Sequence, residues 1–302
     1  MKTYACVVCV VLAFAGAASA QTTNSSYEVA TFGAPPDGGE WSGDTISIAA
    51  DGRGSILALR RADPPVLVFN RNGELLDSWG DGLFPNNHSI DVDHEGSVWI
   101  TDRTNNMVHK YTMDGRPLMS LGTKGVTGDK DSTDAFDGPG DVAVAPNGDI
   151  FVLDGNARIV HFSKDGSFVK TIGGVEGTGP GEFSGAHALA LDTAGRLLVV
   201  DRQEEAHNPR IQIFDQNGSF IEEWPRITGL LHPSGITVGG DGTVYISESD
   251  DANITIVRDG EVVEWIAGLE ARPHNIVWDA GTGDLYLADS NAPGDIKKIN
   301  RK

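Results

Sequence analysis

Short apolar runs separated by glycine turns make up most of the chain. In residues 140–173, for example, "VAV" and "IFVLD" are followed by "RIVHF", an Asp-Gly turn and "FVKTIG". Apolar runs of this length bounded by turns predict β-strands, and Asn-Gly and Asp-Gly pairs suit the positive φ angles of hairpins. The chain therefore predicts an all-β fold built from successive hairpins.

One unit of this pattern recurs six times. The copies begin at "ISIAADGRGSILALRR" (46), "SIDVDHEGSVWITDR" (89), "GDVAVAPNGDIFVLDG" (140), "HALALDTAGRLLVVDR" (187), "SGITVGGDGTVYISES" (234) and "HNIVWDAGTGDLYLADS" (274), with a spacing of 40 to 51 residues. Four short strands per unit and six units predict a six-bladed β-propeller, with a solenoid as the alternative.

The two ends of residues 21–302, which we take as one domain, favour the propeller. The last unit stops at "IKKIN" without a fourth strand, whereas the segment "YEVATFG" (27–33) resembles the fourth strand "FVKTIG". Pairing of these ends would complete the last blade and leave no open sheet edge. We therefore expect the N-terminal strand to close the sixth blade.

The repeat also resembles the NHL family of propellers, in which the second strand ends in Asp and an Arg-Ile pair follows. The motif stands here as Asp154 with Arg158-Ile159 and as Asp201 with Arg210-Ile211. This resemblance covers nearly all of residues 21–302. It implies the fold but no particular activity, because propellers serve both as scaffolds and as enzymes.

Histidine occupies one position of the repeat in three alternate units. We name this the ring position, and its occupants in units one to six are Ile46, His88, Gly140, His187, Ser234 and His274. The first strand of each blade lines the central channel, so alternate blades lie roughly 120° apart around it. Three imidazoles that converge on the axis are the ligand set of a three-histidine metal site, most often zinc.

A single histidine near a strand end is usually a turn or packing residue. Three on one alternate set of blades would arise by chance with a probability on the order of 10⁻⁴ or less, which favours the metal site. The remaining histidines show no such register, and we expect them on the surface or in packing: His94, His109, His161, His207 and His232.

The segments "NNHSIDVDHEGSVWITD", "GAHALALDTAGRLLVVDR" and "RPHNIVWDAGTGDLYLAD" resemble the zinc-ligand segments of peptidyl-α-hydroxyglycine α-amidating lyases. These propeller enzymes cleave a peptidyl α-hydroxyglycine into a peptide amide and glyoxylate. The resemblance implies His88, His187 and His274 as zinc ligands, and Arg61 and Arg202 as active-site arginines. Fixed guanidinium groups suit that role because they hold a carboxylate and offset developing negative charge.

The catalytic positions depart from this family at one place. Asn156 stands where the lyases have a catalytic tyrosine, and an amide cannot accept a proton as a phenolate does. Asp154, His207 or a metal-bound hydroxide could replace the tyrosine, and the sequence does not choose among them. Adjacent Arg60 also leaves the register of Arg61 open.

The resemblance further implies a structural calcium in the channel. Ile48 and Ile90 match the positions whose carbonyls bind it, but Asn275 replaces the family's carboxylate, so any calcium would be held more weakly. Arg272 stands where the family has an apolar methionine, which would change the charge of the pocket.

Composition and charge indicate the compartment of the protein and exclude some classes of partner. Residues 1–20 combine an early lysine, an apolar run and an Ala-Ser-Ala ending, which predicts a signal peptide and an exported protein, extracellular or periplasmic. Both cysteines, Cys6 and Cys9, lie in this leader, so no disulfide or thiolate site is expected beyond it. The net charge of −20 disfavours nucleic acid and anionic lipid as partners.

Two further features of the sequence concern the surface of the protein. Sequons for N-glycosylation occur at Asn24, Asn87, Asn217 and Asn253, and a glycan on Asn87 would stand beside the metal site, so we expect that sequon to be unused. The glycine-rich segments 123–140 and 174–186 either overhang the channel or serve as linkers.

These observations predict a secreted, monomeric, zinc-dependent lyase, with calcium as a second metal. Its substrate would be a peptide or a small carboxylated compound, with no nucleic acid and no membrane insertion after signal cleavage. The alternatives are a non-catalytic NHL propeller that binds protein or ligand, and another metal-dependent lyase or hydrolase on the same scaffold.

Overall fold

The computed structural model describes residues 26–36, 38–203, 208–224, 227, 230–269, 271–291 and 294–302, and the predicted leader, Asn24 and His207 lie outside them. The described residues form β-strands and no helix, and so contain no helix able to cross a membrane. In order from β1 to β24, the strands are Tyr27–Phe32, Thr45–Ala50, Ser55–Arg60, Val66–Asn70, Leu75–Trp79, Asn87–Val92, Val98–Asp102, Met107–Tyr111, Pro117–Leu121, Asp141–Val144, Ile150–Asp154, Arg158–Phe162, Phe168–Gly173, Ala186–Leu191, Leu197–Asp201, Arg210–Phe214, Phe220–Trp224, Pro233–Val238, Val244–Glu248, Asn253–Arg258, Glu261–Ile266, Pro273–Trp278, Leu285–Asp289 and Ile296–Arg301.

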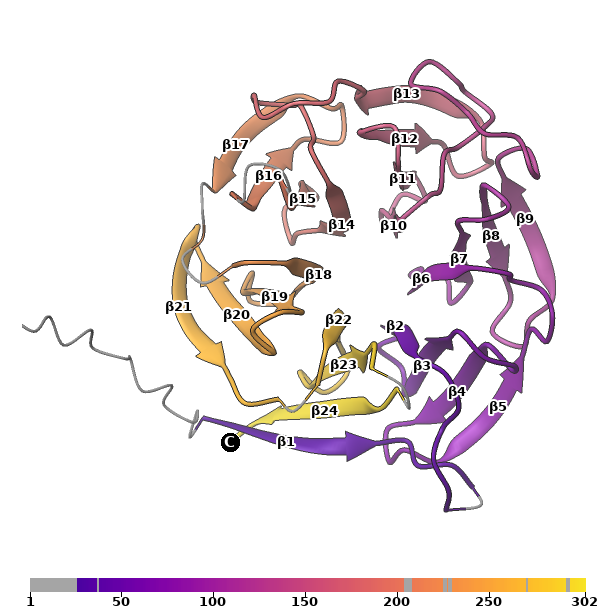
Figure 1. Ribbon diagram of the computed structural model, residues 1–302, viewed down its shortest axis with the longest axis vertical. Helices are drawn as coiled ribbons and strands as arrows, with labels where there is room; N and C mark the ends of the chain where they lie inside the picture. Colours follow the sequence, from indigo (N-terminus) through magenta and orange to yellow (C-terminus); the bar gives the residue numbers. More distant parts are fainter. Residues whose placement is uncertain are drawn as a thin grey trace, which may run out of the picture.

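The strands form six antiparallel sheets of four, arranged as blades around a central channel (Figure 1). In each blade the first strand of the repeat is innermost, and these strands are β2, β6, β10, β14, β18 and β22. The sixth sheet has the order β22-β23-β24-β1, and β1 pairs with β24 from Tyr27↔Arg301 to Phe32↔Ile296. The prediction of a six-bladed propeller is confirmed, and the solenoid is excluded.

The apolar core lies between the blades. Six clusters of buried residues each join two neighbouring blades, and the cluster around Phe69 and Tyr286 joins the first blade to the sixth. Phe32 of β1 packs edge-on against Tyr286 at 4.9 Å between ring centroids. Since every blade buries both of its faces against neighbours, the ring is held together by continuous apolar contact.

A β-bulge marks the ring position in most blades. The pairing of the first strand with the second shifts register at the ring position of five blades. These positions are Ile46, His88, His187, Ser234 and His274. A bulge leaves an extra residue unpaired and turns its side chain out of the normal alternation. The bulges thereby direct the ring-position side chains along the channel.

The NHL motif has a structural role here. Arg158 is fully buried, and its Nε lies 2.8 Å from the carboxylate of Asp154. Arg210 makes the same contact with Asp201 at 3.1 Å. The remaining guanidinium donors reach carbonyls in the glycine-rich segments, namely those of Lys130, Ser132, Ala135, Thr178, Gly179 and Glu182. The motif therefore anchors segments 123–140 and 174–186 to blades three and four.

The sequons differ in exposure. Asn87 and Asn253 are buried, and the amide of Asn87 donates to the carbonyl of Arg60 at 2.9 Å. Asn217 is exposed. Among the described sequons, only Asn217 lies where an attached glycan would meet solvent.

Candidate metal centre

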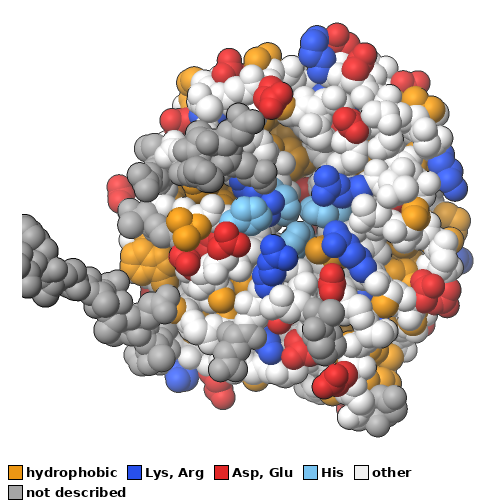
Figure 2. Space-filling view, viewed as in Figure 1, with side chains coloured by type: hydrophobic (Ala, Val, Ile, Leu, Met, Phe, Trp, Pro, Cys, Tyr) orange, Lys and Arg blue, Asp and Glu red, His pale blue; other side chains and the backbone are white. Residues whose placement is uncertain are grey.

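Three histidines from alternate blades meet on the channel axis. The ring centroids of His88, His187 and His274 lie 5.1 to 5.2 Å apart in edge-to-face contact. One nitrogen of each ring lies within 4.8 Å of those of the other two. Figure 2 shows the imidazoles together at the centre of one face of the propeller. The structure thus brings together the three residues that the repeat register predicts.

A backbone carbonyl from the following blade orients each imidazole. Nδ1 of His88 lies 2.7 Å from the carbonyl of Gly140, Nδ1 of His187 lies 2.7 Å from that of Ser234, and Nδ1 of His274 lies 2.8 Å from that of Ile46. These carbonyls belong to the ring positions of the other three blades. Because a carbonyl only accepts, each Nδ1 carries the proton and each Nε2 keeps its lone pair.

The surroundings keep the imidazoles neutral. Burial lowers the pKa of His88 to about 3, and the nearby Arg103 guanidinium adds to this shift. Burial, with contributions from Arg202 and the neighbouring imidazoles, also places the pKa values of His187 and His274 well below the usual value. Protons therefore compete little with a metal for the Nε2 lone pairs.

This donor set fits zinc. A four-coordinate zinc with Zn–N bonds of about 2.0–2.1 Å holds its ligand nitrogens about 3.3 Å apart, and one nitrogen of each ring lies within 4.8 Å of the others, so the bound metal would draw them closer together. The carbonyl partners of Nδ1 are the outer-shell contacts that metal-bound histidines normally make. A three-histidine set leaves a fourth position for a substrate oxygen.

A cavity of about 250 Å³ lies above the imidazoles. Its lining comes from three positions of the repeat: the ring position, the position two residues earlier, and the residue after the second strand. These residues are Ile46, His88, His187 and His274; Asp44, His232 and Arg272; and Arg61, Arg103, Arg202, Ser249 and Ser290. Loops that enter and leave neighbouring strands therefore form the wall of the cavity.

The structure shows which of the adjacent arginines, Arg60 or Arg61, lies at the site. Arg60 ends β3, is buried, donates to the carbonyl of Ser42 and lies over the ring of Trp41 at 4.9 Å. Arg61 instead lines the cavity, as does Arg202, whose guanidinium donates to the carbonyl of Pro233 at 2.8 Å. Both arginines implied by the family resemblance thus lie beside the histidines.

The position that holds the tyrosine in the lyases does not line the cavity above the histidines. Asn156 and Asp154 line a second cavity of about 490 Å³, between the two glycine-rich segments, and not the one above the histidines. Asp154 is also bound to buried Arg158 and accepts from the backbone amide of Asp137 at 2.7 Å. Its carboxylate is occupied by these structural contacts, which argues against Asp154 as a replacement base.

Two lining residues escaped the sequence reasoning. We expected His232 on the surface or in packing, and the structure places it in the wall of the cavity because it stands two residues before the ring position, as Arg272 does. Arg103 was not singled out, although "TDR" repeats the "VDR" that contains Arg202. Comparing all three lining positions across the repeats would have found both residues.

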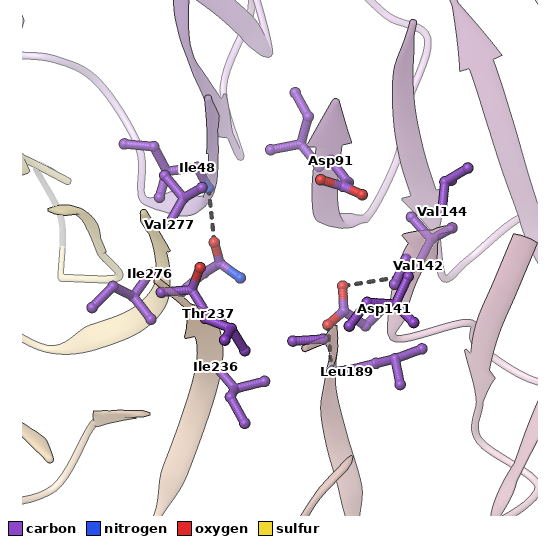
Figure 3. Close-up of a pocket in the computed structure, with 16 residues that line it drawn as sticks. Ile48, Asp91, Asp141, Val142, Val144, Leu189, Ile236, Thr237, Ile276 and Val277 are labelled. Carbon is purple, nitrogen blue, oxygen red and sulfur yellow. Dashed lines mark hydrogen bonds between the residues drawn. The ribbon is translucent and has the colours of Figure 1, made fainter. Parts of the chain in front are cut away.

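Deeper in the channel lies a cavity of about 190 Å³ with the opposite charge (Figure 3). Ile48, Ile90 and Asn275 all line it, so the positions implied for calcium do come together. The amide oxygen of Asn275 accepts from the backbone of Ile48 at 3.1 Å. Burial raises the pKa of Asp91 to about 7 and that of Asp141 to about 6. Calcium binding stays a prediction.

Sequence comparisons identify relatives of two kinds, although no protein-family model matches the chain. The chain is 29% identical over 283 residues to NHL repeat-containing protein 3 of Homo sapiens, a match that covers 83% of this chain and 78% of that protein. It is 36% identical over 154 residues to the Probable peptidyl-alpha-hydroxyglycine alpha-amidating lyase pgal-1 of Caenorhabditis elegans, covering 49% of this chain and 42% of that protein.

The chain is a six-bladed β-propeller whose homologues include NHL repeat-containing protein 3 and the amidating lyases. Among solved structures, this propeller superimposes on a streptogramin B lyase with a TM-score of 0.63 and 18% identity, covering 92% of this chain and 98% of the other. At that identity, the similarity supports the fold alone.

Proposed function

We propose that this NHL-repeat propeller is an exported, zinc-dependent carbon–nitrogen lyase of the amidating-lyase type. The observation that carries the proposal is the set of three neutral, carbonyl-oriented imidazoles beneath a cavity lined by arginines. Homology to amidating lyases supports the same reaction class. The substrate would be an N-acyl α-hydroxyglycine, and the products an amide and glyoxylate.

The reaction needs three things from the site. The bond between the amide nitrogen and the hydroxyl-bearing carbon breaks, the hydroxyl proton leaves as the aldehyde of glyoxylate forms, and a proton reaches the departing nitrogen. Arg61 and Arg202 would hold the substrate carboxylate, and their fixed charges favour one orientation of the scissile bond. When bound by the three histidines, zinc would supply Lewis-acid polarisation of a substrate oxygen.

We assign the proton transfer to His232. It lines the same cavity as the zinc ligands and the two arginines, whereas Asn156 and Asp154 do not. An imidazole can accept a proton on one ring nitrogen and donate one, which suits a group that first takes a proton and then returns it. A single residue would thereby carry the proton from the hydroxyl to the leaving nitrogen.

Two observations favour a second function, a propeller that binds without catalysis. The human NHL repeat-containing protein is covered along 78% of its length, and the tyrosine position of the lyases is Asn156 here, facing another cavity. A propeller that binds a metal and a ligand without turnover would have these properties. It would retain zinc and bind carboxylates but release no glyoxylate.

The test is glyoxylate release from a peptidyl α-hydroxyglycine by zinc-loaded protein, measured beside its zinc content. We expect His187→Ala to lose both zinc and activity, and His232→Gln to keep zinc while its kcat falls roughly 10²- to 10⁴-fold. His94→Ala is the matched control, because His94 is exposed and lies outside the cavity. Wild-type protein that is fully loaded with zinc yet releases no glyoxylate would exclude the amidating lyase and leave another metal-dependent lyase or hydrolase, or the binding function.

A further inference from the structure

Four arginines surround the cavity above the histidines, and among the described residues three of them have no hydrogen-bond or ion-pair partner. Arg202 donates to Pro233 and Ser234. By contrast, the guanidinium groups of Arg61, Arg103 and Arg272 make no hydrogen bond and no ion pair within the described part of the chain. All three are exposed at the mouth. Figure 2 shows basic side chains gathered around the imidazoles on this face.

The charge of this cavity is opposite to that of the protein. The chain has 43 acidic and 23 basic residues, a net charge of −20. Yet the described residues that line the cavity include four arginines and a single carboxylate, Asp44. Burial lowers the pKa of Arg61, the carboxylate of Asp44 opposes this shift and the guanidinium group of Arg103 adds to it, so Arg61 lies near both of these groups. One carboxylate can offset only part of the charge of four guanidinium groups, and like charges repel, so this arrangement favours an anionic ligand with more than one charge.

The order of the blades separates the arginines into two groups. Arg272 precedes the first strand of blade six, Arg61 follows β3 of blade one, and Arg103 follows β7 of blade two, so these three come from consecutive blades. Arg202 belongs to blade four, on the other side of the channel. One substrate carboxylate accounts for Arg61 and Arg202. Arg103 and Arg272, on either side of Arg61, remain without a role.

We propose that Arg103 and Arg272 form a second anion subsite, so that the cavity selects a small substrate with two carboxylates. The α-hydroxy acid part of this assignment rests on the proposed function, and the second carboxylate would belong to the acyl group. A cavity of about 250 Å³ holds a small molecule or the end of a chain, so both carboxylates must lie within one compact compound. An α-hydroxyglycine acylated by a short dicarboxylic acid or by an acidic residue has this form.

The experiment compares two α-hydroxy acids, malate and lactate, which differ mainly in the second carboxylate. Calorimetry on the zinc-loaded protein should give a dissociation constant for malate roughly tenfold or more below that for lactate. In Arg103→Ala/Arg272→Ala this preference should fall to about twofold or less, with zinc content and lactate affinity unchanged. Arg116→Ala is the control, because Arg116 is exposed and lies outside the cavity.

Two further variants separate geometry from charge. Arg103→Lys and Arg272→Lys keep the charge but lose the planar fork, and they should retain only part of the preference for malate. Equal affinity of the wild type for malate and lactate would overturn the proposal, and this measurement needs no variant to fold. An undiminished preference in the double alanine variant would overturn it as well.

Turnover distinguishes this inference from the proposed function. Succinyl-α-hydroxyglycine and propionyl-α-hydroxyglycine differ only in the second carboxylate, and we expect a kcat/KM for the succinyl compound roughly tenfold or more above that for the propionyl compound. If neither compound releases glyoxylate but malate still binds through Arg103 and Arg272, the lyase fails and the subsite stands. If both are cleaved with equal kcat/KM, the lyase stands and the subsite fails.

Discussion

Arginines occur in two settings in this propeller. Arg158 and Arg210 are buried within blades three and four, and a carboxylate and several loop carbonyls accept from each of them. Arg61, Arg103 and Arg272 stand exposed at the channel mouth, and no acceptor among the described residues meets their guanidinium groups. An arginine whose hydrogen-bond acceptors lie within the protein stabilises the fold. A cluster of arginines without such acceptors can instead bind an anionic ligand.

The largest effect should come from the buried group. Arg158→Met would leave the carboxylate of Asp154 buried without its cation and three loop carbonyls without a donor, so we expect the free energy of unfolding to fall by roughly 3–5 kcal/mol. Denaturant unfolding measures the loss. Exposed Arg116→Ala serves as the control, and a loss below about 1 kcal/mol would show that the buried pair contributes little.

The metal centre below the mouth should give the next effect. His88→Ala removes one of three nitrogens that meet on the axis, and we expect the zinc dissociation constant to rise at least about 100-fold. Competition with a chromophoric chelator measures it. His94→Ala should leave zinc affinity unchanged, and similar affinities in the two variants would place the metal elsewhere.

The deeper cavity of the channel is lined by two carboxyl groups, those of Asp91 and Asp141, whereas the mouth is lined by arginines. The carboxylate of Asp141 accepts from Ser89, from the backbone of Val142 and from that of Leu189. Asp141→Asn turns one acceptor into a donor, so the free energy of unfolding should fall by roughly 1–3 kcal/mol. Thermal and denaturant unfolding at fixed pH would detect this, and an unchanged midpoint would contradict it.

The raised pKa of Asp141 also predicts that the free energy of unfolding depends on pH. Burial raises the pKa of Asp141 to about 6 in the folded state, above an unfolded value near 4. Between these values the folded protein binds more protons, so the stabilising contribution is present below about pH 4 and is lost as the pH rises through about 6. The difference in unfolding free energy between wild type and Asp141→Asn should therefore shrink over that window, and a constant difference would argue against the raised pKa.

The smallest effect should come from the mouth arginines. Arg103→Ala removes a guanidinium group that has no partner in the described residues and that lies near Arg61, so we expect the free energy of unfolding to stay within about 0.5 kcal/mol of the wild-type value. The melting temperature, compared with that of Arg158→Met, measures the contrast. A loss close to that of Arg158→Met would remove the distinction between the two groups of arginines.

Much of the fold could be predicted because the same strand and turn pattern recurs six times along the chain. Apolar periodicity and turn residues are local, and six copies of one unit average out local ambiguity. The same register placed His88, His187 and His274 on one ring before any contact was known. Arg61 and Arg202 could be placed beside them only through the resemblance to a known family.

The tertiary structure decided what depends on contacts between blades. The carbonyls that orient the imidazoles come from residues 47 to 228 positions away in the chain, and the bulges that turn the histidines into the channel leave no mark in the apolar pattern. Loop paths placed Arg103 and His232 in the cavity and turned Asn156 away from it. Local sequence determines which strands form, but the alignment of six blades around one axis determines which side chains meet.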